Sequence, residues 1–184
     1  MQTKQNSGQV RLRRNSGGQV LIEAFVSISI ATIGLIGVLS LMTSAVSANR
    51  NVAERFTATY LAGEGIEVVK SVISANYAEG RAWNTGLSEG SYELTYDTTG
   101  ADLGAARIGS DPTIESNRVL RHNETSGLYS YDSSGAETTY TRTVQLTAVN
   151  ADELKVVSLV SWIGRGGSEG RVFVEDHFFD WRPR

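Results

Sequence analysis

An uninterrupted apolar run constrains this 184-residue chain more than any other feature. Residues 20–48 are nearly all apolar or small, and Glu23 is the only charged residue among these 29 positions. As an α-helix at about 1.5 Å per residue, the run would reach roughly 43 Å. That length exceeds the roughly 30 Å of a bilayer's hydrocarbon core. The run therefore predicts a helix that can span a membrane.

Glu23 is a charged residue at the start of this apolar helix, where a charge is unfavourable. A carboxylate costs on the order of 2.5 to 3.5 kcal/mol at a bilayer centre, and less near its edge, so a compensating partner is expected. Glu23 follows the pair Gly17-Gly18 by five residues, and the segment before that pair holds four basic residues and no acid. These are Lys4, Arg11, Arg13 and Arg14. By the positive-inside rule, they predict that the leader stays on the cytoplasmic side.

The junction Gly18 followed by QVLIEAF resembles the processing site of the type IV prepilin family, which includes the type II secretion pseudopilins. The continuation ATIGLIGVLSL is similar to minor pilins of the type IV pilus modification protein group. The resemblance covers roughly residues 17 to 50. It implies that a membrane prepilin peptidase cuts between Gly18 and Gln19. It also implies that Glu23, then the fifth residue, acts in assembly by pairing with the terminal amine of a neighbouring subunit.

Two positions depart from the family's pattern. The first mature residue would be Gln19, where the family usually has phenylalanine, so two fates of the new amine are open. One is the N-methylation that the resemblance implies at Gln19, and the other is cyclisation of the terminal glutamine. Many major pilins also have a proline in this helix, whereas the first proline here is Pro112. Gly34 and Gly37 could soften the helix instead, by roughly 1 kcal/mol each relative to alanine.

The resemblance also implies the partners and the location of the chain. The expected partners are the prepilin peptidase, other pilin subunits, the inner-membrane assembly platform and membrane lipid. The chain would lie in the cytoplasmic membrane before assembly and in an extracellular or periplasmic filament afterwards. Loss of the leader leaves 13 of the 17 basic residues against 20 acidic ones, a side-chain charge near −7. Because nucleic-acid affinity depends on cations that neutralise phosphates, we expect no direct nucleic-acid partner.

Two other classes of protein compete with this interpretation. In a secretory signal peptide, the small residues 46–48 would be the cleavage site, but its apolar region is usually about 7 to 15 residues long. A single-pass membrane-anchored extracellular ligand-binding protein would keep the apolar run uncut. The mature N-terminus separates these classes, because a pilin begins at Gln19, an uncut anchor at Met1 and a secreted domain at Asn49.

The helix is predicted to continue beyond the membrane through residues 49–77. Apolar residues recur there at intervals of three, four or six and predict a stripe on which the sheet of the head packs. The stripe consists of Val52, Phe56, Tyr60, Ile66, Val69, Ile73 and Tyr77. Gly63 and Gly65 interrupt this helix-forming sequence and indicate either close packing or a bend.

The rest of the chain predicts a β-rich head. Three runs rich in β-branched and aromatic residues, with short connections between them, predict an antiparallel meander. They are residues 139–149, 153–163 and 171–181. A further strand is expected at 91–96, a hairpin between 117–122 and 127–132, and a loop over 97–111. The predicted fold is α+β and pilin-like, with a long N-terminal helix packed on a C-terminal antiparallel sheet. Its segments are a leader (1–18), a membrane and filament-core helix (19–48), an amphipathic helix (49–77) and the head (78–184).

We expect no enzyme, no cofactor and no metal. The chain has no cysteine, no nucleophile elbow and no phosphate-loop ending in the glycine-rich connection 164–170. His122 and His177 lie in unrelated strand-like segments without metal-ligand spacing. The acids in 97–111 suggest calcium, but they lack EF-hand spacing, so a solvated loop is expected. The large aromatic residues are expected in the core or on a sheet face rather than in a ligand cage. They are Trp162, Phe173, Phe178 and Trp181.

Overall fold

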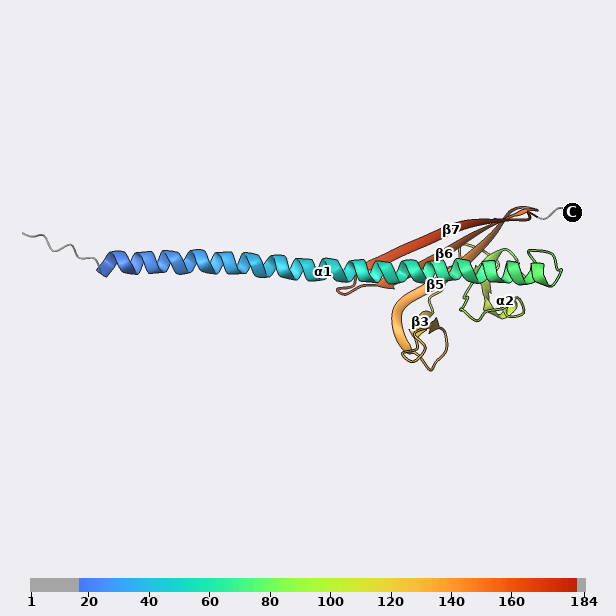
Figure 1. Cartoon of the computed structure of the whole chain (residues 1–184), viewed down its shortest axis with the longest axis horizontal. Helices are drawn as coiled ribbons and strands as arrows, with labels where there is room; N and C mark the ends of the chain where they lie inside the picture. Colours follow the sequence, from blue (N-terminus) through green and yellow to red (C-terminus); the bar gives the residue numbers. More distant parts are fainter. Residues whose placement is uncertain (1–16, 182–184) are drawn as a thin grey trace, which may run out of the picture. The chain divides into compact units, whose positions relative to one another are not determined.

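The computed structural model describes residues 17–181, which divide into two compact units, one ending at Ala48 and the other beginning at Asn49. Helix α1 (Gly17–Ala78) has 62 residues and passes from the first unit into the second. The remaining elements belong to the second unit (Figure 1). They are β1 (Gly90–Tyr92), α2 (Leu103–Ala106), β2 (Arg107–Gly109), β3 (Val119–His122), β4 (Tyr129–Ser130), β5 (Ala136–Asn150), β6 (Glu153–Ile163) and β7 (Glu169–Phe179).

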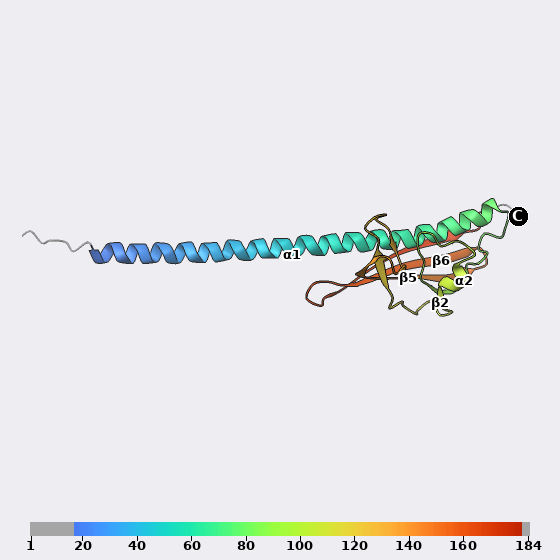
Figure 2. The ribbon, with the colours of Figure 1, turned by 90° about the horizontal axis from the view of Figure 1, so that it is seen from below.

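The seven strands form one antiparallel sheet around β5. One edge of β5 pairs with β6, which in turn pairs with β7, so the predicted C-terminal meander is confirmed. The other edge of β5 pairs with β1 and with β3. The predicted hairpin of β3 and β4 is also confirmed, with Arg121 opposite Ser130. The sheet packs on the C-terminal part of α1, which confirms the α+β class (Figure 2).

The segment between β1 and β3 is more ordered than the sequence predicts. The strand expected at 91–96 is confined to β1, and the expected loop 97–111 contains α2 and β2. Strand β2 exists because Gly109 pairs with Ser91 of β1, and α2 buries Leu103 against the core. Both elements are too short to carry a periodic pattern, since tertiary pairing rather than local propensity forms them.

The apolar stripe predicted on α1 divides between two faces of the helix. Ile66, Val69 and Ile73 are buried against the sheet as predicted. The prediction is wrong for the earlier turns, because Val52, Phe56 and Tyr60 are 64%, 61% and 67% exposed. At about 100° per residue, the step from position 60 to position 66 crosses to another face of the helix. The residues buried in those earlier turns are Ala58, Leu61 and Ala62.

The two glycines of this helical segment have different surroundings. A Cβ atom added at Gly65 would lie 2.9 Å from Val144 Cγ2 and closer still to Ser158 Oγ, whereas one added at Gly63 meets nothing within 4 Å. Gly65 therefore marks a close approach of α1 to β5 and β6, one of the two outcomes that the sequence indicated. Gly63 has no such packing role.

This contrast gives a matched pair of substitutions. Gly65→Ala is expected to destabilise the head by about 1 to 3 kcal/mol, because the added methyl group forces α1 away from the sheet. Gly63→Ala is expected to stabilise it by up to about 1 kcal/mol through helix propensity alone. The measurement is denaturant unfolding of the full chain in detergent. A similar midpoint for both variants would contradict the close approach at Gly65.

A fully buried arginine joins three parts of the second unit. Arg142 of β5 has no exposed surface. Its Nη1 donates to the carbonyl oxygen of Leu61 in α1 at 3.0 Å, and its Nη2 donates to the carbonyl oxygen of Leu94 at 2.6 Å. Nη1 also lies 3.3 Å from Oε1 of Glu64. The Tyr131 hydroxyl donates to the Arg142 carbonyl oxygen, and burial raises the pKa of Tyr131 to about 12.

Candidate functional site

The predicted processing and assembly residues lie on the first turns of α1. Gly18, Gln19 and Glu23 are all helical and exposed. Gln19 and Glu23 are four residues apart, so they share one face of the helix. Within residues 17–181, Glu23 makes no hydrogen bond or ion pair to another side chain. The four basic leader residues, Lys4, Arg11, Arg13 and Arg14, lie outside the described residues.

The helix that follows presents apolar side chains around its whole circumference. Every large apolar side chain from position 20 to position 46 is about half exposed or more. They are Val20, Leu21, Ile22, Phe25, Val26, Ile28, Ile30, Ile33, Leu35, Ile36, Val38, Leu39, Leu41, Met42 and Val46. Patches of this extent on a soluble protein mark interaction surfaces. This surface therefore requires cover from lipid or from other protein.

Three hydroxyl groups of this apolar stretch bond within the helix itself. Ser29, Thr32 and Thr43 each donate a side-chain hydroxyl to the carbonyl oxygen four residues earlier, at 2.7 to 3.0 Å. Such internal bonds satisfy these three hydroxyl donors without water. Within the described part of the chain, α1 is the one helix long and apolar enough to cross a membrane. Gly34 and Gly37 lie inside it with open space beside them, and α1 remains helical through both.

The candidate metal ligands do not converge. Asp102 accepts hydrogen bonds from Thr99, and Asp111 accepts them from Thr113, which lowers the pKa of each carboxyl. No group of three or more histidine, aspartate or glutamate side chains within residues 17–181 could hold a metal ion. The ring of His122 lies beside Tyr129, with 4.8 Å between ring centroids.

His177 takes part in a half-buried ionic cluster on the sheet. Its Nδ1 lies 2.8 Å from Oε1 of Glu153, and its Nε2 lies 3.3 Å from Oε1 of Glu175. These two carboxylates, Glu153 first, raise the pKa of His177. Because the pKa of His177 is raised on folding, the protonated ring stabilises the folded state. This contribution is complete at pH values below the ordinary histidine pKa and is lost as pH rises through the pKa of the folded state.

The aromatic residues predicted for the core or a sheet face divide between buried and exposed positions. Trp162 is buried, and its Nε1 donates to Oε2 of Glu54 at 3.2 Å. Phe178 packs against the main core, whereas Phe173 is exposed on the sheet. Trp181 is exposed and lies 5.8 Å from the Tyr77 ring.

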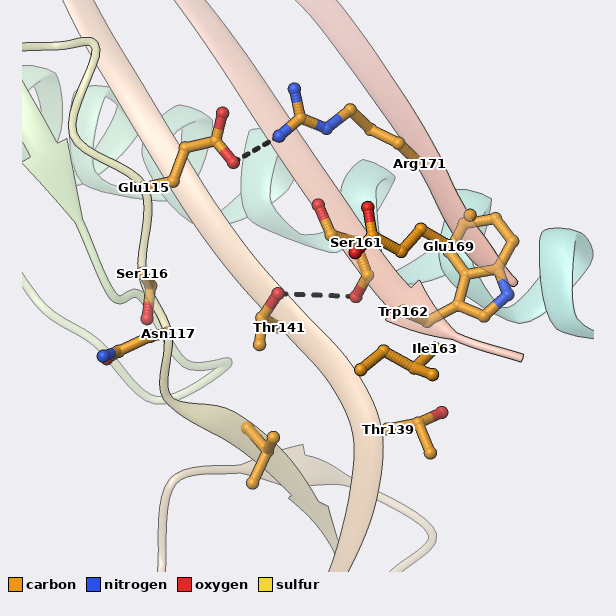
Figure 3. A pocket seen from close by; sticks show the side chains of 12 residues that line it. Glu115, Ser116, Asn117, Thr139, Thr141, Ser161, Trp162, Ile163, Glu169 and Arg171 are labelled. Atoms are coloured by element: carbon orange, nitrogen blue, oxygen red, sulfur yellow. Dashed lines mark hydrogen bonds and ion pairs between the residues drawn. The ribbon is translucent and has the colours of Figure 1, made fainter. Parts of the chain in front are cut away.

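One cavity in the second unit was not anticipated from the sequence. It has a volume of about 590 Å³ and lies over β5, β6 and the start of β7 (Figure 3). Thr141 and Ser161 line it, and Thr141 Oγ1 donates to the Ser161 carbonyl oxygen at 3.4 Å. An ion pair between Glu115 and Arg171 borders it. These residues come from three distant parts of the sequence, and no motif links them.

Comparison of the chain with family models, with curated proteins and with solved structures finds no match. We therefore infer function from the residues of this chain and their arrangement.

Proposed function

We propose that the chain is a minor pilin or pseudopilin, a structural subunit without catalytic activity. In this proposal a prepilin peptidase cuts after Gly18, and an inner-membrane assembly platform transfers the mature chain from the membrane into a type IV pilus-like filament. The apolar part of α1 contacts lipid before the transfer and neighbouring subunits after it. Because both surroundings are apolar, the transfer leaves the apolar side chains covered throughout.

The observation that carries the proposal is the position of Glu23. It is the single charge in residues 20–48, the part of α1 that is apolar on every side, and it lies one turn after Gln19. A charge that is buried without a partner costs several kcal/mol. Pairing of Glu23 with the Gln19 amine of a neighbouring subunit would favour one axial offset between helices and penalise the others. That role requires a free amine at Gln19, and therefore cleavage.

A second candidate function keeps the anchor and changes the role of the head. The cavity beside Thr141 and Ser161 supports a membrane-anchored extracellular ligand-binding protein (Figure 3). Hydroxyl groups and an ion pair at its border could orient a polar ligand. This alternative does not require cleavage after Gly18 and assigns no role to Glu23. The N-terminus of the chain in the membrane therefore distinguishes the two functions.

The test is mass spectrometry of the N-terminus in membrane and filament fractions. The wild-type chain is expected to begin at Gln19, with the same measurement reporting a methylated or cyclised residue. Gly18→Glu is expected to leave the leader attached and to keep the chain out of filaments. Gly34→Ala, at a glycine with open space around it, serves as the matched control and should be cut normally. A Gly18→Glu chain that still begins at Gln19 would exclude the assigned cleavage site.

A further inference from the structure

Strand β7 leaves one border of the sheet open. It pairs with β6 over eleven consecutive residue pairs without a register shift, and no other described strand pairs with its second edge (Figure 1). The strands that end the sheet elsewhere are short, with three residues in β2 and two in β4. Short strands and bulges are devices that prevent edge pairing with another chain. Strand β7 has neither of them.

The side chains of β7 alternate between the two faces of the sheet. Val172 and Val174 are half-buried and pack against the core beneath α1. Phe173 faces the other way and is 65% exposed. Arg171 and Glu175 stand two residues before and after Phe173, so they share its face. The exposed face of β7 therefore presents a basic, an aromatic and an acidic side chain in succession.

The backbone of the same residues is directed to the open edge. The N–H of His177 donates to Oδ1 of Asp176 at 2.8 Å. In an antiparallel ladder, alternate residues direct their backbone groups to opposite sides of the strand. Arg171, Phe173 and Glu175 share the parity of His177, so their N–H and C=O groups point to the open edge.

We propose that β7 pairs antiparallel with β7 of a second copy of this chain, centred on Phe173. In this register Arg171 lies opposite the partner's Glu175, Val172 opposite the partner's Val174, and Phe173 opposite the partner's Phe173. Cross-strand pairs of opposite charge or of aromatic rings are each worth roughly 0.2 to 1 kcal/mol. The segment from Arg171 to Glu175 is therefore complementary in charge to the same segment of the second copy.

This register is specific. Sliding the partner by two residues in one direction places Glu175 opposite the partner's Glu169, and like charges directly opposite are destabilising. A slide by one residue sets the exposed face against the half-buried one. Within each copy Arg171 already pairs with Glu115, and Glu175 with Lys155, at exposed positions. The charges therefore specify the register, while burial of Phe173 and the backbone hydrogen bonds supply the attraction.

The antiparallel pairing also determines the relative orientation of the two copies. Near the start of β7, Glu54 of α1 bonds to Trp162, which pairs with Gly170, and at its end the Tyr77 hydroxyl donates to Asp180. The helix of the second unit and β7 therefore run in the same direction. In an antiparallel pair, the Asn49 ends of the two copies lie at opposite ends of the joined sheet. The partner is thus a copy whose second unit is held in the opposite orientation.

Because the chain has no cysteine, single cysteines test the register directly. In the proposed pair residue 173 faces its own copy with about 5.5 Å between Cα atoms, a distance that a disulfide spans. Phe173→Cys should therefore form disulfide dimers in the full chain, purified in detergent and mildly oxidised. Phe179→Cys is the matched control, since Phe179 is 54% exposed on the same face of the same strand. The two copies of residue 179 would lie roughly 40 Å apart and should stay reduced.

A dimer with Phe173→Cys alone supports the proposal. Similar cross-linking of both variants would mean parallel or random contact, and no cross-linking of Phe173→Cys would mean no pairing; either result overturns it. Phe173→Lys should abolish association of the cysteine-free chain in sedimentation, and at concentrations where the wild type is monomeric both chains should unfold at the same midpoint. All these experiments use the uncut chain, so they are independent of the processing and filament entry proposed above.

Discussion

Arg142→Ala is expected to destabilise the head by about 3 to 5 kcal/mol, the largest loss of stability that the structure predicts. The guanidinium is fully buried, and the carbonyl oxygens of Leu61 and Leu94 accept its hydrogen bonds. The substitution removes the donor from both carbonyl oxygens and removes the ion-pair partner of the Glu64 carboxylate. A hydrogen bond to a charged group contributes about 1.5 to 3 kcal/mol. Since total stability is typically 5 to 15 kcal/mol, the head would be marginal or unfolded at physiological temperature.

The matched control for this prediction is an arginine in an exposed ion pair. Arg171→Ala removes the pair with Glu115 and is expected to change stability by no more than about 1 kcal/mol. The measurement is the free energy of unfolding of both full-length variants from urea titration in detergent. Equal losses for Arg142→Ala and Arg171→Ala would show that the buried network contributes no more than a surface pair.

Glu23→Val is expected to abolish most incorporation into filaments while leaving cleavage and membrane insertion intact. Insertion should become easier, because the substitution removes the cost of a charge in the membrane. Incorporation should fall because the Gln19 amine of a neighbouring subunit loses its partner, a loss of several kcal/mol if that amine is buried in the filament. Glu23→Asp should be intermediate, since it keeps the charge on a shorter side chain.

The measurement is the amount of each variant in purified filaments relative to its membrane pool. Glu124→Val, which removes an exposed charge in the turn between β3 and β4, is the control and should be incorporated like the wild type. Equal incorporation of Glu23→Val and the wild type would refute the pairing role. Glu23 would then serve only in recognition by the processing and assembly machinery.

Elements with a long periodic pattern could be predicted from the sequence. The apolar run, the helix through residue 77 and the three C-terminal strands all carry such patterns over ten or more residues. Strand β2 and helix α2 could not be predicted, because their three and four residues form only where β1 and the core are already in place. The apolar stripe on α1 was predicted in the correct helix but partly on the wrong face. The spacing of positions 52, 56 and 60 predicts a helix, but it does not indicate whether the sheet packs on the face that these residues form.

The candidate site divides in the same way. The junction at Gly18 and the charge at Glu23 are visible in the sequence because they interrupt a uniform composition. Arg142 was missed, although one signal was present. It shares the alternation of Val144 and Leu146, which places an arginine on the buried face of its strand. The cavity beside Thr141 has no signal of this kind, because its residues meet only when three separate segments fold together.

By itself the sequence determined that residues 20–48 form a helical stretch that is apolar on every side, that this stretch carries a single charge near its start, and that a β-rich segment follows later in the chain. Those properties depend on composition and local periodicity, which neighbouring residues supply. Only the tertiary structure decided that Gly65 brings α1 against β5 and β6, that Arg142 links the helix to the sheet, and that β7 keeps an open edge. Each of these depends on contacts between residues far apart in the chain, and hydrophobic burial selects such contacts without any local sequence signal.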